Sequence, residues 1–97
     1  MADDDDAPLR VPIEPEIDLH SFAPADIPSV VEEYVSEAVA AGFPKVRIVH
    51  GRGRGVQRGI VQAVLERLPA VVEFWDDAAS HLGATIARLK ARAEARP

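Results

Sequence analysis

The sequence contains no cysteine, which excludes disulfide bonds, thiolate metal sites and a cysteine nucleophile. It also lacks a long apolar run, and its first residues are acidic where a signal peptide is basic, so neither a signal peptide nor a membrane span is expected. Its 97 residues allow one domain with a single modest core. We therefore expect a cytoplasmic domain with no membrane partner, and a monomer is the favoured oligomeric state.

Negative charge is concentrated at the start of the chain. Residues 1–18 hold seven acidic side chains and one arginine, whereas the chain from Leu19 onward holds nine acidic and ten basic ones. The net charge of −5 would argue against a polyanionic partner only if it were evenly spread. DNA or RNA therefore stays open as a partner.

The two ends of the chain have the composition of segments outside a fold. Residues 1–15 combine an acidic run with three prolines, which is typical of a disordered arm. Residues 91–97 form a basic tail that either extends a nucleic-acid surface or is simply solvated. The folded domain is expected over residues 16–90. The acidic arm leaves a protein-interaction domain open as a third functional class.

Hydrophobic periodicity predicts a β-α-β-α-β-β order. Strands are expected at 16–20, 45–49, 71–75 and 84–89, and helices at 26–41, capped by Asp26, and 56–68. The last two strands are eight residues apart, which is too short for a parallel crossover, so they pair antiparallel if they are neighbours. The strands are half polar, so we predict an α/β two-layer sandwich, a four-stranded mixed sheet with both helices on one face.

Asp18, His20 and His50 lie at the ends of the first two predicted strands. If those strands are adjacent and parallel, their carboxyl ends share an edge, which is where ligands bind to open sheets. One acid and two histidines suit general acid–base catalysis or a divalent metal such as Mg²⁺. Alternatively, each histidine is a surface or locally hydrogen-bonded residue. His81 has no supporting pattern.

The stretch "HGRGRG" directly precedes the second predicted helix. Gly51, Gly53 and Gly55 allow backbone N–H groups to turn toward an anion, which a helix N-terminus also favours. Arg52, Arg54 and Arg58 add positive charge with bidentate reach for phosphate. A flexible turn without a ligand is the alternative.

Two nucleotide-binding motifs are excluded. The dinucleotide fingerprint needs a glycine at its sixth position, where counting from Gly51 gives Val56, and no Gly-Lys-Ser/Thr is present. No nucleotide cofactor is therefore expected. Trp75 and Phe22 have the chemistry to stack on bases, but their composition favours packing.

Three blocks, "IDLHSF", "VRIVHGRGRG" and "LGATIARL", resemble in order and spacing the signature blocks of the Smr (small MutS-related) domain family, over Glu16 to Leu89. The resemblance implies the same β-α-β-α-β-β fold and a role in nicking or cleaving DNA or RNA, or in binding branched or structured nucleic acid. It is closest in kind to the small free members. It places these residues in the site: Asp18, His20, His50, Gly51, Gly53, Gly83, Ala84 and Thr85. Of the third block, Gly83 and Thr85 are expected to contact phosphate beside the loop.

Two positions differ from the usual family pattern. Ser21-Phe22 follows the Asp-Leu-His block, where many members have glycine and a stand-alone subgroup is similar to this chain. Ser80-His81 stands where the family usually has Gly-Gly, a change expected to reshape that loop and narrow the site.

The leading functional hypothesis is a nucleic-acid endonuclease. Asp18 and His20 activate water or hold a metal, His50 protonates the leaving oxygen, and the glycine-arginine loop holds the phosphate. The alternative is a binding module without catalysis that uses the loop arginines on the phosphate backbone. DNA and RNA are not distinguished by the sequence.

Overall fold

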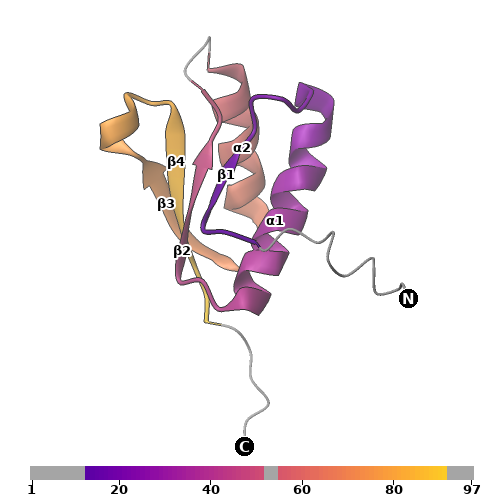
Figure 1. The fold of residues 1–97 in the computed structure, drawn as a ribbon, viewed down its shortest axis with the longest axis vertical. Coiled ribbons are helices and arrows are strands. Elements are labelled where there is room, and N and C mark those ends of the chain that lie inside the picture. The colour runs from indigo at the N-terminus through magenta and orange to yellow at the C-terminus, as the bar shows by residue number, and fades with distance from the viewer. Residues whose placement is uncertain (1–12, 52–54, 92–97) are drawn as a thin grey trace, which may run out of the picture.

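The structure is a computed structural model, and it describes residues 13–51 and 55–91 (Figure 1). The predicted arm up to residue 12, the tail from residue 92 and loop residues 52–54 lie outside the described residues. The strands are β1 (Glu16–Asp18), β2 (Lys45–Val49), β3 (Val71–Asp76) and β4 (Ala84–Leu89), and the α-helices are α1 (Ile27–Ala41) and α2 (Val56–Arg67). None of the helices in the described ranges combines the length and apolar character needed to cross a membrane.

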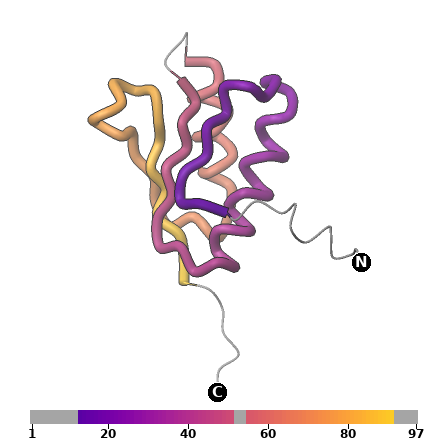
Figure 2. Tube along the Cα trace, in the orientation of Figure 1, coloured from indigo at the N-terminus to yellow at the C-terminus, as the bar shows by residue number. Residues whose placement is uncertain are grey.

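In this part of the chain the four strands form one sheet in the order β1-β2-β4-β3. The β1 and β2 strands are parallel, and β4 runs antiparallel to both β2 and β3, with a register shift between Val71 and Glu73. Figures 1 and 2 show both helices on the same side of this sheet. The predicted two-layer mixed α/β fold is therefore confirmed, as is the antiparallel pairing of its last two strands.

Helix α1 forms because its apolar residues recur at helical spacing and are buried together. The buried set is Ile27, Val31, Tyr34, Val35 and Ala38. The helix ends at Gly42, whose left-handed φ of 86° turns its N–H back toward the last carbonyls. Asp26 occupies the N-cap position, but its side chain makes no capping hydrogen bond, because a 3₁₀ turn (Pro24–Asp26) leads directly into the helix.

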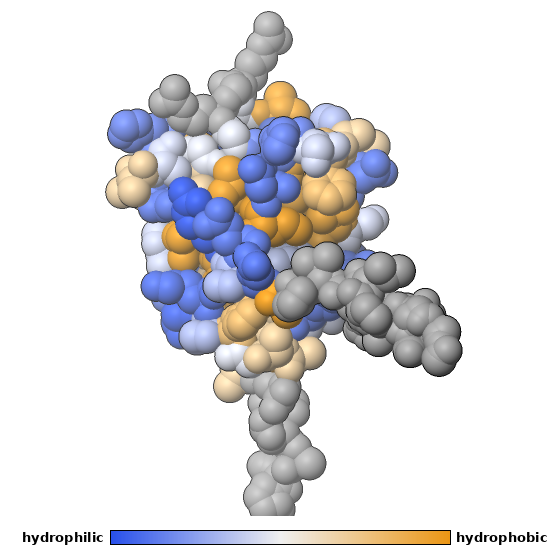
Figure 3. All heavy atoms as spheres, viewed as in Figure 1, coloured by the Kyte–Doolittle hydropathy of each residue, from blue (hydrophilic) through white to orange (hydrophobic). Residues whose placement is uncertain are grey.

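The core lies between the sheet and the two helices. Alternate strand residues face the helices and are buried, namely Val46, Ile48, Ala87 and Leu89. Each fully buried large aliphatic side chain stabilises the fold by about 1.5–3 kcal/mol. Figure 3 shows hydrophobic residues (orange) among hydrophilic ones (blue) over β1 and α1. Ile17 of β1 and Val30 of α1 pack against the core but are only partly buried.

The two residues considered for stacking are more exposed than expected. Trp75 is 41% exposed and Phe22 is 38% exposed. Phe74 packs against the core, so alternation along β3 places Trp75 on the open face of the sheet. Phe22 lies in the turn that follows β1, beyond the reach of the strand pattern.

Residues 13–15, which the composition assigned to the arm, contact the folded part of the chain. Ile13 packs against the core, the Tyr34 hydroxyl donates to the Glu14 carbonyl at 2.6 Å, and the Arg47 N–H donates to the Pro15 carbonyl at 2.8 Å. These bonds use backbone carbonyls of residues 14 and 15, which any sequence offers, so composition could not reveal them.

Titration of the Tyr34 hydroxyl tests whether Tyr34 is buried against the segment that contains Glu14. The chain has one tyrosine, so the titration reports on Tyr34 alone. Burial, with the charges of Glu16 and Glu14, raises the pKa of Tyr34 to about 12. An unfolded phenol ionises near pH 10, so the stabilisation is complete below about pH 10 and is lost as the pH rises through 12. Tyrosinate absorbance should report the raised midpoint, and Tyr34→Phe should cost about 1 kcal/mol below pH 10. An unshifted midpoint in the folded protein would contradict the packing described here.

Candidate active site

The carboxyl ends of β1 and β2 meet at one edge of the sheet, as predicted. Asp18 pairs with Val49 in the parallel register, and the Leu19 N–H donates to the Val49 carbonyl at 2.8 Å. His20 therefore follows β1 at the edge where His50 and Gly51 follow β2. The turn before β4 closes the same edge, since the N–H groups of His50 and Gly51 donate to the Gly83 carbonyl at 3.0 and 2.9 Å.

Asp18 and His20 form a hydrogen-bonded pair on the solvent side of this edge. Asp18 Oδ1 accepts from the backbone N–H of His20 at 2.9 Å and lies 3.0 Å from its Nδ1. The backbone N–H, and then the ring of His20, hold the pKa of Asp18 below its usual value, so Asp18 is a carboxylate at neutral pH.

This pairing fixes which ring nitrogen of His20 carries the proton. A carboxylate only accepts, so Nδ1 of a neutral His20 is the N–H and Nε2 holds the lone pair. No described residue bonds to Nε2, and the His20 side chain is 79% exposed. An aspartate that orients a histidine in this way is the arrangement that makes the imidazole a general base.

His50 lies on the other side of the sheet from His20. It is 3% exposed, and its ring nitrogens are bonded to the Gly51 carbonyl (Nδ1, 3.0 Å) and the Thr85 hydroxyl (Nε2, 2.9 Å). The role predicted for His50, protonation of a leaving oxygen, does not match this geometry, because the ring is shielded and both nitrogens have partners. His50 instead ties the start of the loop to β4.

The residues of the third signature block support the loop from below. Ala84 and Thr85 are fully buried, and the carbonyl of the buried Gly83 accepts from the start of the loop. Gly83 and Thr85 were predicted to contact phosphate. In the structure the Gly83 carbonyl accepts from the His50–Gly51 segment and the Gly83 N–H donates to Ser80, while the Thr85 hydroxyl bonds to His50 and Gln62.

Glycine is required where the loop begins and ends. Gly51 has φ 85° and Gly55 has φ 83°, a conformation that costs an L-residue roughly 1–2 kcal/mol. Gly55 is the N-cap of α2, and no side chain of the described residues caps that helix, which suits its first N–H groups to bind solvent or an anion. Arg52, Gly53 and Arg54, predicted to hold phosphate, lie outside the described residues.

Arg58, also predicted as a phosphate ligand, is engaged with a carboxylate. Its Nε and Nη2 donate to Asp76 Oδ1 and Oδ2 at 2.7 and 2.8 Å. This guanidinium, together with the Gln62 amide, holds the pKa of Asp76 below its usual value. Gln62 and Asp76 were missed in the sequence. The available signal was a polar pair, Arg58 and Gln62, one turn apart on the helix beside the buried Val61.

Ser80 supports the turn that differs from the usual family pattern. Its hydroxyl donates to the Asp77 carbonyl at 2.7 Å and accepts from the N–H groups of Gly83 and Ala84 at 3.1 and 2.9 Å. His81 and Leu82 adopt φ values of 54° and 71°. The turn therefore keeps a left-handed backbone at two positions without glycine.

Metal binding stays a prediction. Across residues 13–51 and 55–91 no group of three or more histidine or acidic side chains is placed to hold an ion. Asp18 and His20 supply two ligand atoms of the kind that Mg²⁺ or a transition metal accepts.

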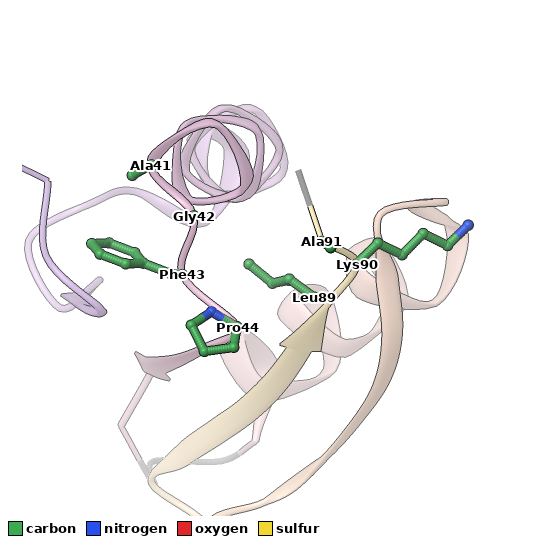
Figure 4. A pocket seen from close by; sticks show the side chains of 7 residues that line it. All are labelled: Ala41, Gly42, Phe43, Pro44, Leu89, Lys90 and Ala91. Carbon is green, nitrogen blue, oxygen red and sulfur yellow. The ribbon is translucent and has the colours of Figure 1, made fainter. Parts of the chain in front are cut away.

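The hollow shown in Figure 4 lies at the end of the molecule opposite the edge that carries His20. It has a volume of about 450 Å³ and is lined by residues 41–44 and 89–91, where α1 and β4 end. Its lining is of mixed polarity, and the Lys90 ammonium points away from it in Figure 4. The described candidate residues Asp18, His20 and His50 lie at the other edge and not at this hollow.

Arg47 forms an ion pair with Asp77 on the open face of the sheet, and low pH should break this pair. Its Nε donates to Asp77 Oδ2 at 2.6 Å, and this guanidinium holds the pKa of Asp77 below its usual value. A depressed carboxyl pKa stabilises the fold above the unfolded value, near pH 4, and that stabilisation is lost as the pH falls through the lower folded value. As the pH is lowered below about 4, the urea unfolding midpoint of Asp77→Asn should therefore decrease less than that of the unmodified protein.

Glu32→Gln is the matched control, because the Glu32–Arg67 pair is exposed and far from the edge. Its acid dependence should equal that of the unmodified protein. Equal dependence for Asp77→Asn would show that the Arg47 contact does not stabilise the turn.

Comparison with known proteins identifies the family. The Smr domain model matches residues 17–90. The chain is 37% identical over 81 residues to Endonuclease MutS2 of Thermomicrobium roseum and 39% identical over 77 residues to that of Geobacillus thermodenitrificans. These matches cover 80% and 77% of this chain, which spans about a tenth of the length of either relative.

Two solved structures share the fold. The Smr domain of Thermus thermophilus MutS2 matches with a TM-score of 0.73 and 30% identity, over 77% of this chain and 96% of that one. YdaL, a stand-alone small MutS-related protein from Escherichia coli, matches with a TM-score of 0.73 and 22% identity, over 87% and 70%. Sequence and fold agree, and the chain belongs to the Smr domain family.

Proposed function

We propose that this domain is a nucleic-acid endonuclease in which His20 is the general base. The observation that carries the proposal is the Asp18–His20 pair, with Nδ1 held at 3.0 Å by Asp18 and Nε2 open to solvent at the edge where the glycine loop begins. The curated relatives are named endonucleases, and the Smr domain match to residues 17–90 includes the pair.

The proposed chemistry is hydrolysis of a phosphodiester. His20 Nε2 takes a proton from water as the water oxygen bonds to phosphorus, and the ester P–O bond breaks. The Asp18 carboxylate stabilises the imidazolium that forms. The departing oxygen takes a proton from that imidazolium or from solvent. Positive charge near the phosphate would come from Arg52, Arg54 and the N-terminus of α2.

The proposed activity is tested by incubating supercoiled plasmid and structured RNA with the pure protein, each with and without EDTA. Cleavage of either substrate supports the proposal, and its loss in EDTA would assign a divalent metal to the reaction. No cleavage of either, with added Mg²⁺ or Mn²⁺, would contradict it.

A binding module without catalysis is the second candidate. The burial of His50 favours it, because no second proton-transfer side chain with a free ring nitrogen lies beside His20 among the described residues. Binding through the loop should weaken steeply with salt, with each phosphate contact adding about 0.9 to the log–log slope for duplex DNA. Salt-dependent binding that survives His20→Gln without any cleavage would select this function.

A further inference from the structure

A chain of hydrogen bonds runs beneath the loop from α2 to His50. Arg58 donates twice to Asp76, and Gln62 Nε2 donates to Asp76 Oδ1 and to Thr85 Oγ1, each at 3.0 Å. The Thr85 hydroxyl then meets His50 Nε2 at 2.9 Å. These residues come from α2, β3 and β4 and from the end of β2, so the chain joins four elements at the edge that carries the site.

The donor and acceptor groups in this series of hydrogen bonds fix the direction of each bond. The Asp76 carboxylate only accepts, so it holds the Gln62 side chain with its NH₂ group inward, and the second amide hydrogen goes to the Thr85 oxygen. The Gly51 carbonyl also only accepts, so His50 Nδ1 carries a hydrogen. In neutral His50 the Nε2 lone pair then accepts from the Thr85 hydroxyl.

The same hydrogen bonds link the His50 tautomer to the backbone of Gly51 at the start of the loop. The His50 ring bonds to the Gly51 carbonyl at 3.0 Å, and the Gly51 N–H bonds to the Gly83 carbonyl at 2.9 Å. Both polar groups of residue 51 are therefore held, at a backbone conformation that only glycine adopts readily. An altered His50 tautomer would break one of these bonds and free the start of the loop.

We infer that Gln62 and Asp76 are positioning residues, which hold His50 in its Nδ1–H tautomer and so fix Gly51 at the start of the loop. Neither residue needs to contact a substrate, since each acts through Thr85 and His50. Their effect on cleavage rests on the proposed endonuclease function, but their effect on the tautomer does not.

The test is nitrogen NMR of the imidazole rings at about pH 8.5, where histidines are largely neutral. The His50 signals are assigned by their loss in His50→Asn. In the unmodified protein His50 should show its hydrogen on Nδ1 alone. Gln62→Met should give a mixture of tautomers, because the freed Thr85 hydroxyl can then also accept from an Nε2–H, and the Gly51 carbonyl alone is left to favour Nδ1–H. Asp76→Asn should do the same, since an asparagine amide can pair with either orientation of Gln62.

Gln57→Met is the matched control, because the structure gives Gln57 on the same helix no side-chain hydrogen bond among the described residues, and it should leave the His50 signals unchanged. Where cleavage is measurable, Gln62→Met should slow it up to about 100-fold, as small displacements of positioning groups do. An Nε2–H tautomer in the unmodified protein, or a single unchanged tautomer in both Gln62→Met and Asp76→Asn, would overturn the inference. Absent cleavage with the expected spectra would overturn the endonuclease proposal alone.

Discussion

Replacing His20 with glutamine is expected to slow phosphodiester cleavage by about 10²–10⁴-fold while leaving the fold intact. The loss is large because glutamine cannot take up a proton at neutral pH. The fold should be unaffected because the His20 side chain is 79% exposed and its described side-chain bond is to Asp18. Cleavage rates at saturating enzyme, with circular dichroism to confirm folding, measure both effects.

Asp18→Asn should lower the same rate for a related reason. An asparagine NH₂ can donate to Nδ1, so a neutral His20 can then carry its hydrogen on Nε2 and lose its lone pair toward solvent. His81→Asn is the matched control, because His81 is an exposed histidine in the neighbouring turn at φ 54°, a conformation that asparagine tolerates. Its rate should equal that of the unmodified protein.

Thr85→Val is expected to destabilise the fold by roughly 1–3 kcal/mol, although valine has nearly the same shape. Thr85 is fully buried, and its hydroxyl serves both His50 Nε2 and Gln62 Nε2. Valine leaves His50 without its partner in a buried site, and the desolvation of that nitrogen is then not compensated.

Thr85→Ser separates the hydroxyl from the methyl group. Serine keeps both hydrogen bonds and should lose only about 1 kcal/mol from the missing methyl group. Urea unfolding of the two variants measures the difference. A Thr85→Val protein as stable as the unmodified protein would show that the buried hydroxyl contributes nothing and would remove the support for the loop described here.

Much of the fold was predictable because local patterns and packing agree. The strand 45–49 has the predicted bounds, and helix α1 begins within one residue of its predicted start, since their apolar residues all face one core. The edge shared by His20 and His50 followed from parallel pairing of the first two strands.

The sequence also determines that the two histidines point to opposite faces of the sheet, because successive residues of a strand alternate between the two faces. Ile17 and Leu19 face the core, so Asp18 and His20 face solvent, whereas Val46 and Ile48 face the core and place His50 on the helix side with them. The same alternation that located the strands therefore predicts a buried His50.

The partners of Arg58 and Arg47 could not be predicted in this way. Asp76 and Asp77 are neighbours in sequence, yet one pairs with α2 and the other with β2, because successive residues at the end of a strand point to opposite faces. These pairs depend on how strand and helix ends meet in three dimensions, which neither composition nor spacing reports. The roles of Gln62 and Asp76 depend on the same tertiary contacts.

The central claim is that the Asp18–His20 pair cleaves a phosphodiester, and the most direct measurement compares His20→Gln with His81→Asn on the substrate that the unmodified protein cuts. The structure predicts that His20→Gln loses at least about 100-fold in rate while His81→Asn retains the full rate. Equal rates for His20→Gln and the unmodified protein would contradict it.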